Sequence, residues 1–243
     1  MHKVDIPQWV LDRVMEARGK LHTFDDLNPR TTALLVVDMQ NAFLMDNVAH
    51  SLSTAARGIV PNINRIAATL RSTGGLVVWI KNVDTLESHT SWSVYRKLLT
   101  PARRAKRTEA MREGAVGHEL WSELDVRGSD LILKKERFSA FIQGSSDLEQ
   151  QLRSRGIDTV VVTGTDTGVC CESTARDAMM RNFKTIMVSD GNASKTDAEH
   201  NAALTAFYRN FGDVMSTDEL IGYIHKNSAA EAASAPDKAL SRV

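Results

Sequence analysis

Three side chains of complementary chemistry stand just after apolar segments of this chain: the carboxylate of Asp38, the ammonium of Lys135 and the thiol of Cys170. A free cysteine is mostly thiol at neutral pH, and only its thiolate attacks well. A neighbouring ammonium and the first turn of a helix both stabilise a thiolate. A carboxylate can take the thiol proton and later deliver it to a departing amine. Together, the three residues predict nucleophilic catalysis by Cys170.

Each of these residues also has an ordinary structural interpretation. An aspartate after a strand often only caps a turn, and Lys134 with Lys135 is typical of a solvated strand end. A cysteine among apolar residues usually fills the core, and this is the role that we expect for Cys171. The catalytic hypothesis therefore depends on the joint placement of the three residues, not on any one of them.

Six apolar runs rich in β-branched residues predict strands, the last of them weakly: residues 33–37, 76–80, 131–133, 159–163, 185–188 and 214–216. The runs are continuous and do not alternate, which is typical of strands buried on both faces of a parallel sheet. Segments of helical period lie between them. We therefore expect a single α/β domain, a doubly wound parallel sheet with helices on both faces. Such sheets bind ligands beyond the carboxyl ends of their strands, where Asp38, Lys135 and Cys170 would meet.

The domain organisation that the sequence favours is one unit, residues 1–226, with two additions. An amphipathic helix is expected at residues 6–18, and residues 84–121 form a long insertion between the second and third strands. Residues 227–243 are rich in Ala and Ser and predict a flexible tail. The helix and the insertion carry more apolar and aromatic residues than one small domain needs, so we expect a homo-oligomer.

The composition argues against several classes of function. The 30 Lys and Arg residues balance the 30 Asp and Glu residues, so neither nucleic acid nor an anionic membrane is favoured as a partner. The basic run 103–107 is interpreted as a solvated helix face. No window has the length of a membrane span, and the two adjacent cysteines exclude a disulfide scaffold. The cysteine usage fits a reducing compartment, so we expect a cytoplasmic protein. There is no phosphate loop and no dinucleotide fingerprint, so no cofactor is expected.

Three segments of the chain resemble, in order, the motifs of isochorismatase-like hydrolases. The first is LLVVDMQNAF at residues 34–43, the second is KERFSAF at 135–141, and the third is TGTDTGVCCESTARDA at 163–178. The resemblance runs from about residue 31 to residue 211. Three ordered motifs make it specific.

The resemblance implies a six-stranded parallel sheet and an Asp38–Lys135–Cys170 triad. It also implies a cis peptide before Asp166 and an oxyanion hole formed by the backbone N–H groups of Asp166 and Cys170. Position 166 is usually small or apolar in the family, so we expect the Asp166 side chain to turn aside or to accept hydrogen bonds from substrate N–H groups. The residues that we expect to contact substrate are Asn41, Phe43, Phe138, Phe141 and Tyr208.

The thiol favours the amidohydrolase branch of that family, because members that cleave the vinyl ether of isochorismate need no cysteine nucleophile. Nicotinamidases typically carry a metal-binding His cluster soon after the first motif, and only His50 lies there in this chain, so no metal is expected. We expect cleavage of a small ureide or carboxamide through a thioester, with ureidoacrylate- or biuret/triuret-like substrates leading. An isochorismatase-type or nicotinamidase-type hydrolase is the alternative. The family favours a tetramer.

A remote alternative rests on residues 164–168, which fit the nucleophile elbow of an α/β-hydrolase with Asp166 as nucleophile. That reaction needs a later histidine, either His200 or His225. It leaves Asp38 and Lys135 without a role.

Overall fold

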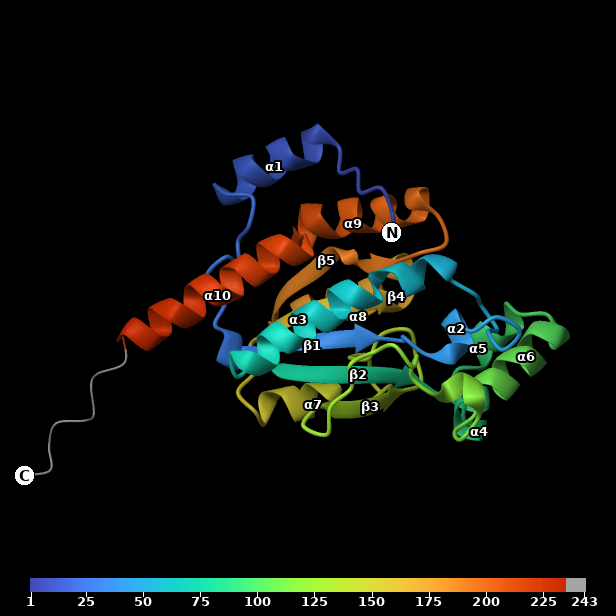
Figure 1. Cartoon of the computed structure of the whole chain (residues 1–243). Coiled ribbons are helices and arrows are strands. Elements are labelled where there is room, and N and C mark those ends of the chain that lie inside the picture. Colours follow the sequence, from blue (N-terminus) through green and yellow to red (C-terminus); the bar gives the residue numbers. More distant parts are fainter. Residues whose placement is uncertain (235–243) are drawn as a thin grey trace, which may run out of the picture.

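The computed structural model describes residues 1–234 of the chain. Its centre is one six-stranded, all-parallel sheet with the strand order β3-β2-β1-β4-β5-β6 (Figure 1). The strands are β1 (Thr32–Val37), β2 (Leu76–Asn82), β3 (Leu131–Lys135), β4 (Thr159–Thr165), β5 (Lys184–Ala193) and β6 (Asp213–Met215). The doubly wound α/β fold expected from the sequence is confirmed.

The central strands are buried on both faces, as their continuous apolar runs predict. In β1, Leu35 and Val37 belong to one hydrophobic core, whereas Leu34 and Val36 belong to another on the opposite face. This division follows from the alternation of side chains along a strand. A strand that serves two cores has no polar face, which is why its sequence does not alternate.

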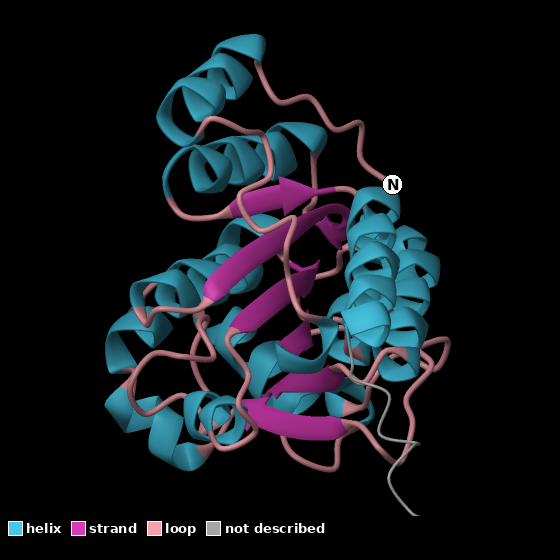
Figure 2. Cartoon of the chain, turned by 90° about the vertical axis from the view of Figure 1, so that its left-hand side faces the viewer, coloured by secondary structure: helices cyan, strands magenta, loops and turns pink. Residues whose placement is uncertain are grey.

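Helices cover both faces of the sheet (Figure 2). The first core contains residues of α1 (Gln8–Arg18), α7 (Leu148–Arg153), α8 (Glu172–Met180) and α9 (Asp197–Asn210). The second core contains residues of α3 (Val60–Ser72) and α10 (Thr217–Ser234). In α3, Ile63, Ile66 and Leu70 are all fully buried, because their spacing places them on one side of the helix.

The insertion between β2 and β3 lies beyond the carboxyl ends of the strands, at the right of Figure 1. It holds the short helices α4 (Leu86–Ser91), α5 (Ser93–Lys97) and α6 (Pro101–Met111), while α2 (Asn41–Leu44) follows β1 at the same edge. The crevice expected there is therefore walled by strand ends, by the loops that follow them and by the insertion.

The two ends of the chain differ in detail from the prediction. Helix α1 begins at Gln8, after Pro7, and ends at Arg18. The flexible tail predicted for residues 227–243 is wrong for its first part, since α10 continues through Ser234. The Asn227 side chain donates to the carbonyl oxygens of Asp25 and Leu27 and anchors that helix. The rest of the predicted tail lies outside the described residues. No helix between residues 1 and 234 has the length and apolarity needed to cross a membrane.

Candidate active site

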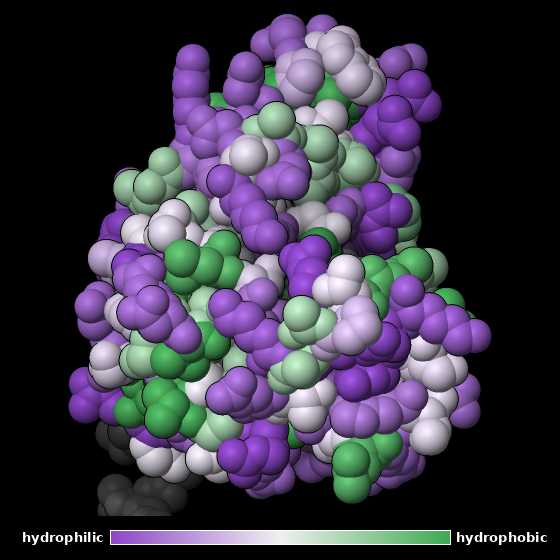
Figure 3. Space-filling model, turned by 90° about the vertical axis from the view of Figure 1, so that its right-hand side faces the viewer, coloured by the Kyte–Doolittle hydropathy of each residue, from purple (hydrophilic) through white to green (hydrophobic). Residues whose placement is uncertain are grey.

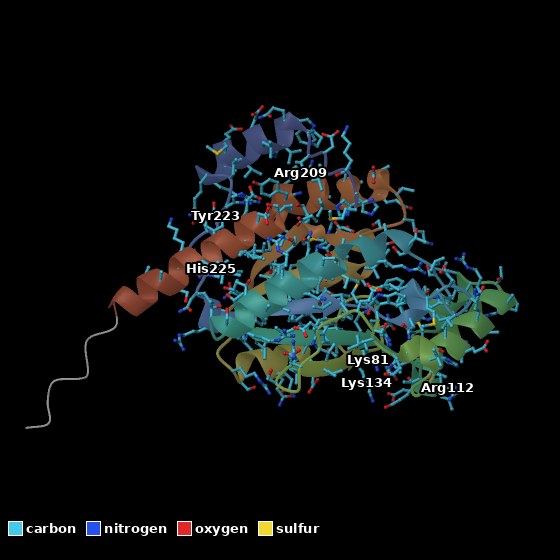
Figure 4. The ribbon with its side chains drawn as sticks, viewed as in Figure 1. Lys81, Arg112, Lys134, Arg209, Tyr223 and His225 are labelled. Atoms are coloured by element: carbon cyan, nitrogen blue, oxygen red, sulfur yellow. The ribbon has the colours of Figure 1, made fainter. Side chains whose placement is uncertain are left out.

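The strand ends bring Asp38 and Lys135 into a buried ion pair. Lys135 Nζ lies 2.9 Å from Asp38 Oδ2 and also donates to the carbonyl oxygen of Arg137 at 3.0 Å. Both paired side chains are fully buried. Strand β2 separates β1 from β3, so the long lysine side chain reaches Asp38 past the end of the intervening strand. Lys134 points outward, where it pairs with Glu113 (Figure 4).

Cys170 lies in a single π-helical turn, Thr167–Cys171, directly before α8. Burial raises the pKa of its thiol, and the charge of Asp38 raises it further, while Lys135 lowers it by less. Lys135 thus lowers the thiol pKa in the expected direction, but burial and Asp38 outweigh it. Cys171 is wholly buried and its Sγ lies 3.9 Å from the carbonyl oxygen of Thr163, in agreement with the predicted core role.

Burial lowers the pKa of the Lys135 ammonium, but the Asp38 carboxylate favours the charged form and leaves the pKa raised. Asp38 Oδ1 is buried and has no hydrogen-bond partner among the described residues. The pair thus leaves one carboxylate oxygen free to receive a proton, next to a protonated thiol. This arrangement suits an acid–base step that begins when a substrate binds.

A glycine allows the loop that holds Cys170 to lie close to Asp38. Gly164 stands opposite Val37 in the β4–β1 pairing and has a φ of +118°. A Cβ atom at this position would lie 2.1 Å from the carbonyl oxygen of Val37. Only glycine permits that approach of the two backbones.

The Thr165–Asp166 peptide that follows is cis, as the family resemblance implies. Asp166 Oδ1 accepts hydrogen bonds from Ser194 Oγ, just after β5, at 2.6 Å and from Gly168 N, in its own loop, at 3.2 Å. Asp166 also lines the cavity beside Cys170, so the expectation that its carboxylate accepts hydrogen bonds from substrate N–H groups stays a prediction.

A cavity of about 260 Å³ opens beside Cys170, with Asp38 and Lys135 buried beneath its floor. Figure 3 shows the side of the molecule that lies at the right of Figure 1, where hydrophilic and hydrophobic side chains are mixed. The residues that line the cavity include Phe43, His50, Asn82, Arg107, Phe138 and Cys170. Two of the expected substrate contacts, Phe43 and Phe138, are thus in place.

The other three expected contacts do not line the cavity. Asn41 is buried, and its Nδ2 donates a hydrogen bond to the carbonyl oxygen of Val116. The side chain therefore holds a segment of the insertion that precedes β3. Phe141 belongs to the core under α7. The Tyr208 hydroxyl donates to the carbonyl oxygen of Leu21, near α1 and away from the strand ends. These predictions were wrong, because a motif or helical period does not tell which way a side chain points.

Several cavity residues were not found from the sequence. Asn82 is the last residue of β2, and the rule that located Asp38 would have located it. Arg107 comes from α6. The basic run in this helix was interpreted as a solvated face, yet Arg107 is only 3% exposed. His50 and Tyr95 come from loops and short helices whose positions no local pattern predicts.

Neither histidine of the nucleophile-elbow alternative is available to Asp166. The His200 ring bonds Thr167 Oγ1 and the carbonyl oxygen of Ser189. His225 lies on α10, toward the end of the molecule opposite the cavity (Figure 4). No cluster of three or more His, Cys, Asp or Glu side chains that could hold a metal occurs within residues 1–234. The expectation of a metal-free site stays a prediction.

Comparison with known proteins agrees with this geometry. The isochorismatase domain profile matches residues 32–219. A ureidoacrylate amidohydrolase from Methylorubrum extorquens is 32% identical over 222 residues, covering 86% of this chain and 85% of that protein. The structure of a cysteine hydrolase from Pseudomonas syringae pv. phaseolicola matches with a TM-score of 0.75 at 28% identity, over 83% of this chain and 96% of the other. For N-carbamoylsarcosine amidase from Thermoplasma acidophilum the TM-score is 0.62 at 29% identity, over 77% and 97%. The chain therefore belongs to the isochorismatase family of hydrolases.

Proposed function

We propose that this chain is a cysteine-dependent amidohydrolase that cleaves a small ureide or carboxamide through a thioester on Cys170. The observation that supports this most is the fully buried Lys135–Asp38 pair, 2.9 Å apart, beneath a thiol that lines a cavity. Similar proteins are named amidohydrolases. The chain is an enzyme of that kind, a hydrolase that acts on C–N bonds other than peptide bonds.

In the first half of the reaction, Cys170 Sγ attacks the substrate carbonyl carbon as its proton passes to Asp38. The raised pKa of the thiol makes this coupled transfer preferable to a preformed thiolate. Backbone N–H groups of Asp166 and Cys170 would hold the oxyanion of the tetrahedral intermediate. The C–N bond then breaks, the nitrogen takes the proton from Asp38, and ammonia or an amine departs.

The second half removes the acyl group from sulfur. Asp38 takes a proton from water, whose oxygen attacks the thioester carbonyl. The C–S bond breaks, sulfur regains a proton, and the acid product leaves. Lys135 stays charged throughout and keeps the Asp38 carboxylate in position, since its ammonium is bound to Asp38 and to a backbone carbonyl.

The substrate class follows from the cavity and from the named relative. The volume of about 260 Å³ suits a small ligand, and the aromatic walls Phe43 and Phe138 suit a flat conjugated one. An amidohydrolase named for ureidoacrylate is 32% identical. We therefore favour a ureidoacrylate-like ureide, followed by biuret and triuret.

The test is ammonia release from a panel of ureidoacrylate, biuret, triuret, carbamoylsarcosine and nicotinamide. We expect wild-type protein to turn over a ureide, Cys170→Ser to lose nearly all activity, and Cys171→Ala to keep most of it. Equal losses in both folded variants would contradict the assignment of Cys170. Turnover of nicotinamide alone would support the nicotinamidase-type alternative.

A further inference from the structure

Arg107 places a buried positive charge in the wall of the cavity. It projects from α6 and its side chain is only 4% exposed. Its Nη2 donates to Asn82 Oδ1 at 3.3 Å, and its Nε lies 3.4 Å from Asp84 Oδ1. Among the described residues, no partner is found for Nη1. A buried guanidinium that lines a ligand cavity and keeps a nitrogen without a partner is a strong site for an anion.

The charge of Arg107 is only partly neutralised by its protein neighbours. Within residues 1–234, Asp84 is the only carboxylate that pairs with Arg107, and the same oxygen lies 3.5 Å from Arg96 Nη1. The other oxygen of Asp84 is used by His89 Nε2 and Thr108 Oγ1, each at 2.7 Å. One carboxylate shared between two guanidinium groups leaves this end of the cavity with an excess of positive charge.

The His50 side chain lies in the same positively charged part of the cavity. Burial first, and then the charges of Arg107, Lys106 and Arg103, lower the pKa of His50 to about 3, although Asp84 acts in the opposite direction. The neutral ring lines the cavity, and its buried Nε2 has no hydrogen-bond partner among the described residues. The ring can therefore donate or accept a hydrogen bond without adding a charge.

The acidic groups of the cavity belong to a different wall. Asp166 bonds Ser194, and Glu199 bonds Thr196 at the start of α9. Asp166 follows β4, as Cys170 does, and Glu199 lies in the first turn of α9, which follows β5. Arg107 instead groups with Asn82 and with the Tyr95 ring, which lies 5.3 Å from the guanidinium carbon. The cavity thus has the thiol in one wall and the guanidinium in another.

We propose that Arg107, assisted by Asn82 and His50, binds a carboxylate of the substrate while Cys170 attacks the amide carbonyl of the same molecule. This inference rests on the proposed function and narrows it. The substrate is then an anionic ureide or amide whose carboxylate lies a few bonds from the scissile carbonyl. Neutral ureides such as biuret and triuret leave the guanidinium without a partner and are poor substrates.

The experiment compares 3-ureidoacrylate with its methyl ester, which differs chiefly in lacking the negative charge. Ammonia release gives kcat/KM for each compound with wild-type, Arg107→Met and Arg96→Met protein. Arg96 is the matched control, because it also contacts Asp84 but does not line the cavity. We expect wild-type protein and Arg96→Met to prefer the acid by about 10- to 100-fold, the range of a charge-assisted hydrogen-bonded pair. Arg107→Met should bring that ratio close to one.

Binding to Cys170→Ala protein, measured by calorimetry, separates this inference from the proposed function. Tighter binding of the acid than of the ester, lost when Arg107→Met is added, supports the carboxylate site even where no ammonia is released. An absence of ammonia release by wild-type protein would then contradict only the proposed substrate. Equal binding of acid and ester, or equal effects of Arg96→Met and Arg107→Met, would overturn the carboxylate site. Should Arg107→Met fail to fold, two other quantities test the carboxylate site: the acid-to-ester ratio of kcat/KM for wild-type protein and the acid-to-ester ratio of Kd for Cys170→Ala. Ratios close to one would overturn the site.

Discussion

At the scale of single residues, the surroundings of Cys170 favour the protonated thiol over the thiolate. Burial and Asp38 raise the pKa of the thiol more than Lys135 lowers it. Thiolate is the form that alkylating agents attack, so modification of the resting enzyme should be slow at neutral pH and should increase as the pH rises. A buried thiol next to a carboxylate therefore behaves as a latent nucleophile.

We predict opposite shifts of the alkylation profile in two variants. Asp38→Asn removes an anion that raises the thiol pKa, so iodoacetamide should modify Cys170 at lower pH than in wild-type protein. Lys135→Met removes the cation that lowers that pKa, so the profile should move to higher pH. Mass spectrometry distinguishes Cys170 from Cys171. The triad would be wrong if Lys135→Met changed neither the profile nor the turnover.

Turnover should respond differently from alkylation. Asp38→Asn removes the proton carrier of both half-reactions and should lower kcat by about 10²-fold to 10⁴-fold, while leaving a thiol that can be alkylated. Because removing one partner of a buried ion pair costs about 3–5 kcal/mol, thermal melts must show that each variant is folded. A folded Asp38→Asn enzyme with normal kcat would contradict the proton-carrier role.

At the scale of secondary-structure elements, the close contact of β4 with β1 depends on Gly164. The Gly164→Ala change forces a Cβ atom against the Val37 carbonyl at an unfavourable φ, so we expect the free energy of unfolding to fall by about 3 kcal/mol or more. Gly156→Ala is the control, because Gly156 has a φ of +69° but nothing within 4 Å of its added Cβ. Its cost should be only about 1 kcal/mol. Urea unfolding measures both, and equal costs would contradict the steric explanation.

The insertion helices are joined by one carboxylate. Asp84 accepts from His89 of α4, Arg96 of α5 and Thr108 of α6. Burial raises the pKa of Asp84, but the hydrogen bonds of His89 and Thr108, followed by the charge of Arg107, outweigh it and leave the pKa lowered. A lowered folded-state pKa means that the carboxylate stabilises the insertion above its unfolded-state pKa and loses this effect as the pH falls through the folded-state value.

We therefore predict that Asp84→Asn speeds amide hydrogen exchange in residues 84–111 at neutral pH. The difference from wild-type protein should shrink as the pH is lowered, once intrinsic exchange rates are corrected, because protonated Asp84 resembles the amide. Glu87→Gln, an exposed acid-to-amide change on α4, should leave the exchange rates unaltered. A difference that persists unchanged at low pH would show that the charge of Asp84 is not what holds the helices.

At the scale of the whole molecule, large apolar side chains remain exposed on the two additions to the sheet. Leu86, Val94 and Leu98 of the insertion are 84%, 70% and 78% exposed, and Trp9 of α1 is 53% exposed. Such groups favour association with further copies of the chain. We predict a homo-oligomer, with a tetramer favoured, and sedimentation velocity at micromolar concentration tests this. A monomer at that concentration would refute it.

The sequence by itself determined the sheet and the position of the reactive edge. Continuous β-branched runs such as residues 159–163 are typical of strands buried on both faces, and parallel strands place their carboxyl ends together. Asp38 and Lys135 closely follow such runs, so strand geometry places both at the same edge of the sheet, and the strand order β3-β2-β1 with the long lysine side chain then allows them to pair. The three ordered motifs, at residues 34–43, 135–141 and 163–178, then indicated the family. These features are local, and local patterns are enough to predict them.

Only the tertiary structure decided what surrounds the thiol. The pKa of Cys170 depends on how deeply it is buried and on its distance from Asp38, and neither quantity is encoded in a short segment. Arg107 sits in a basic run typical of a solvated face, yet packing of α6 against the end of β2 turns it inward. Tyr208, expected in the pocket, faces α1 instead. Side-chain direction is set by contacts between segments far apart in the chain. The sequence alone therefore could not predict which residues line the cavity.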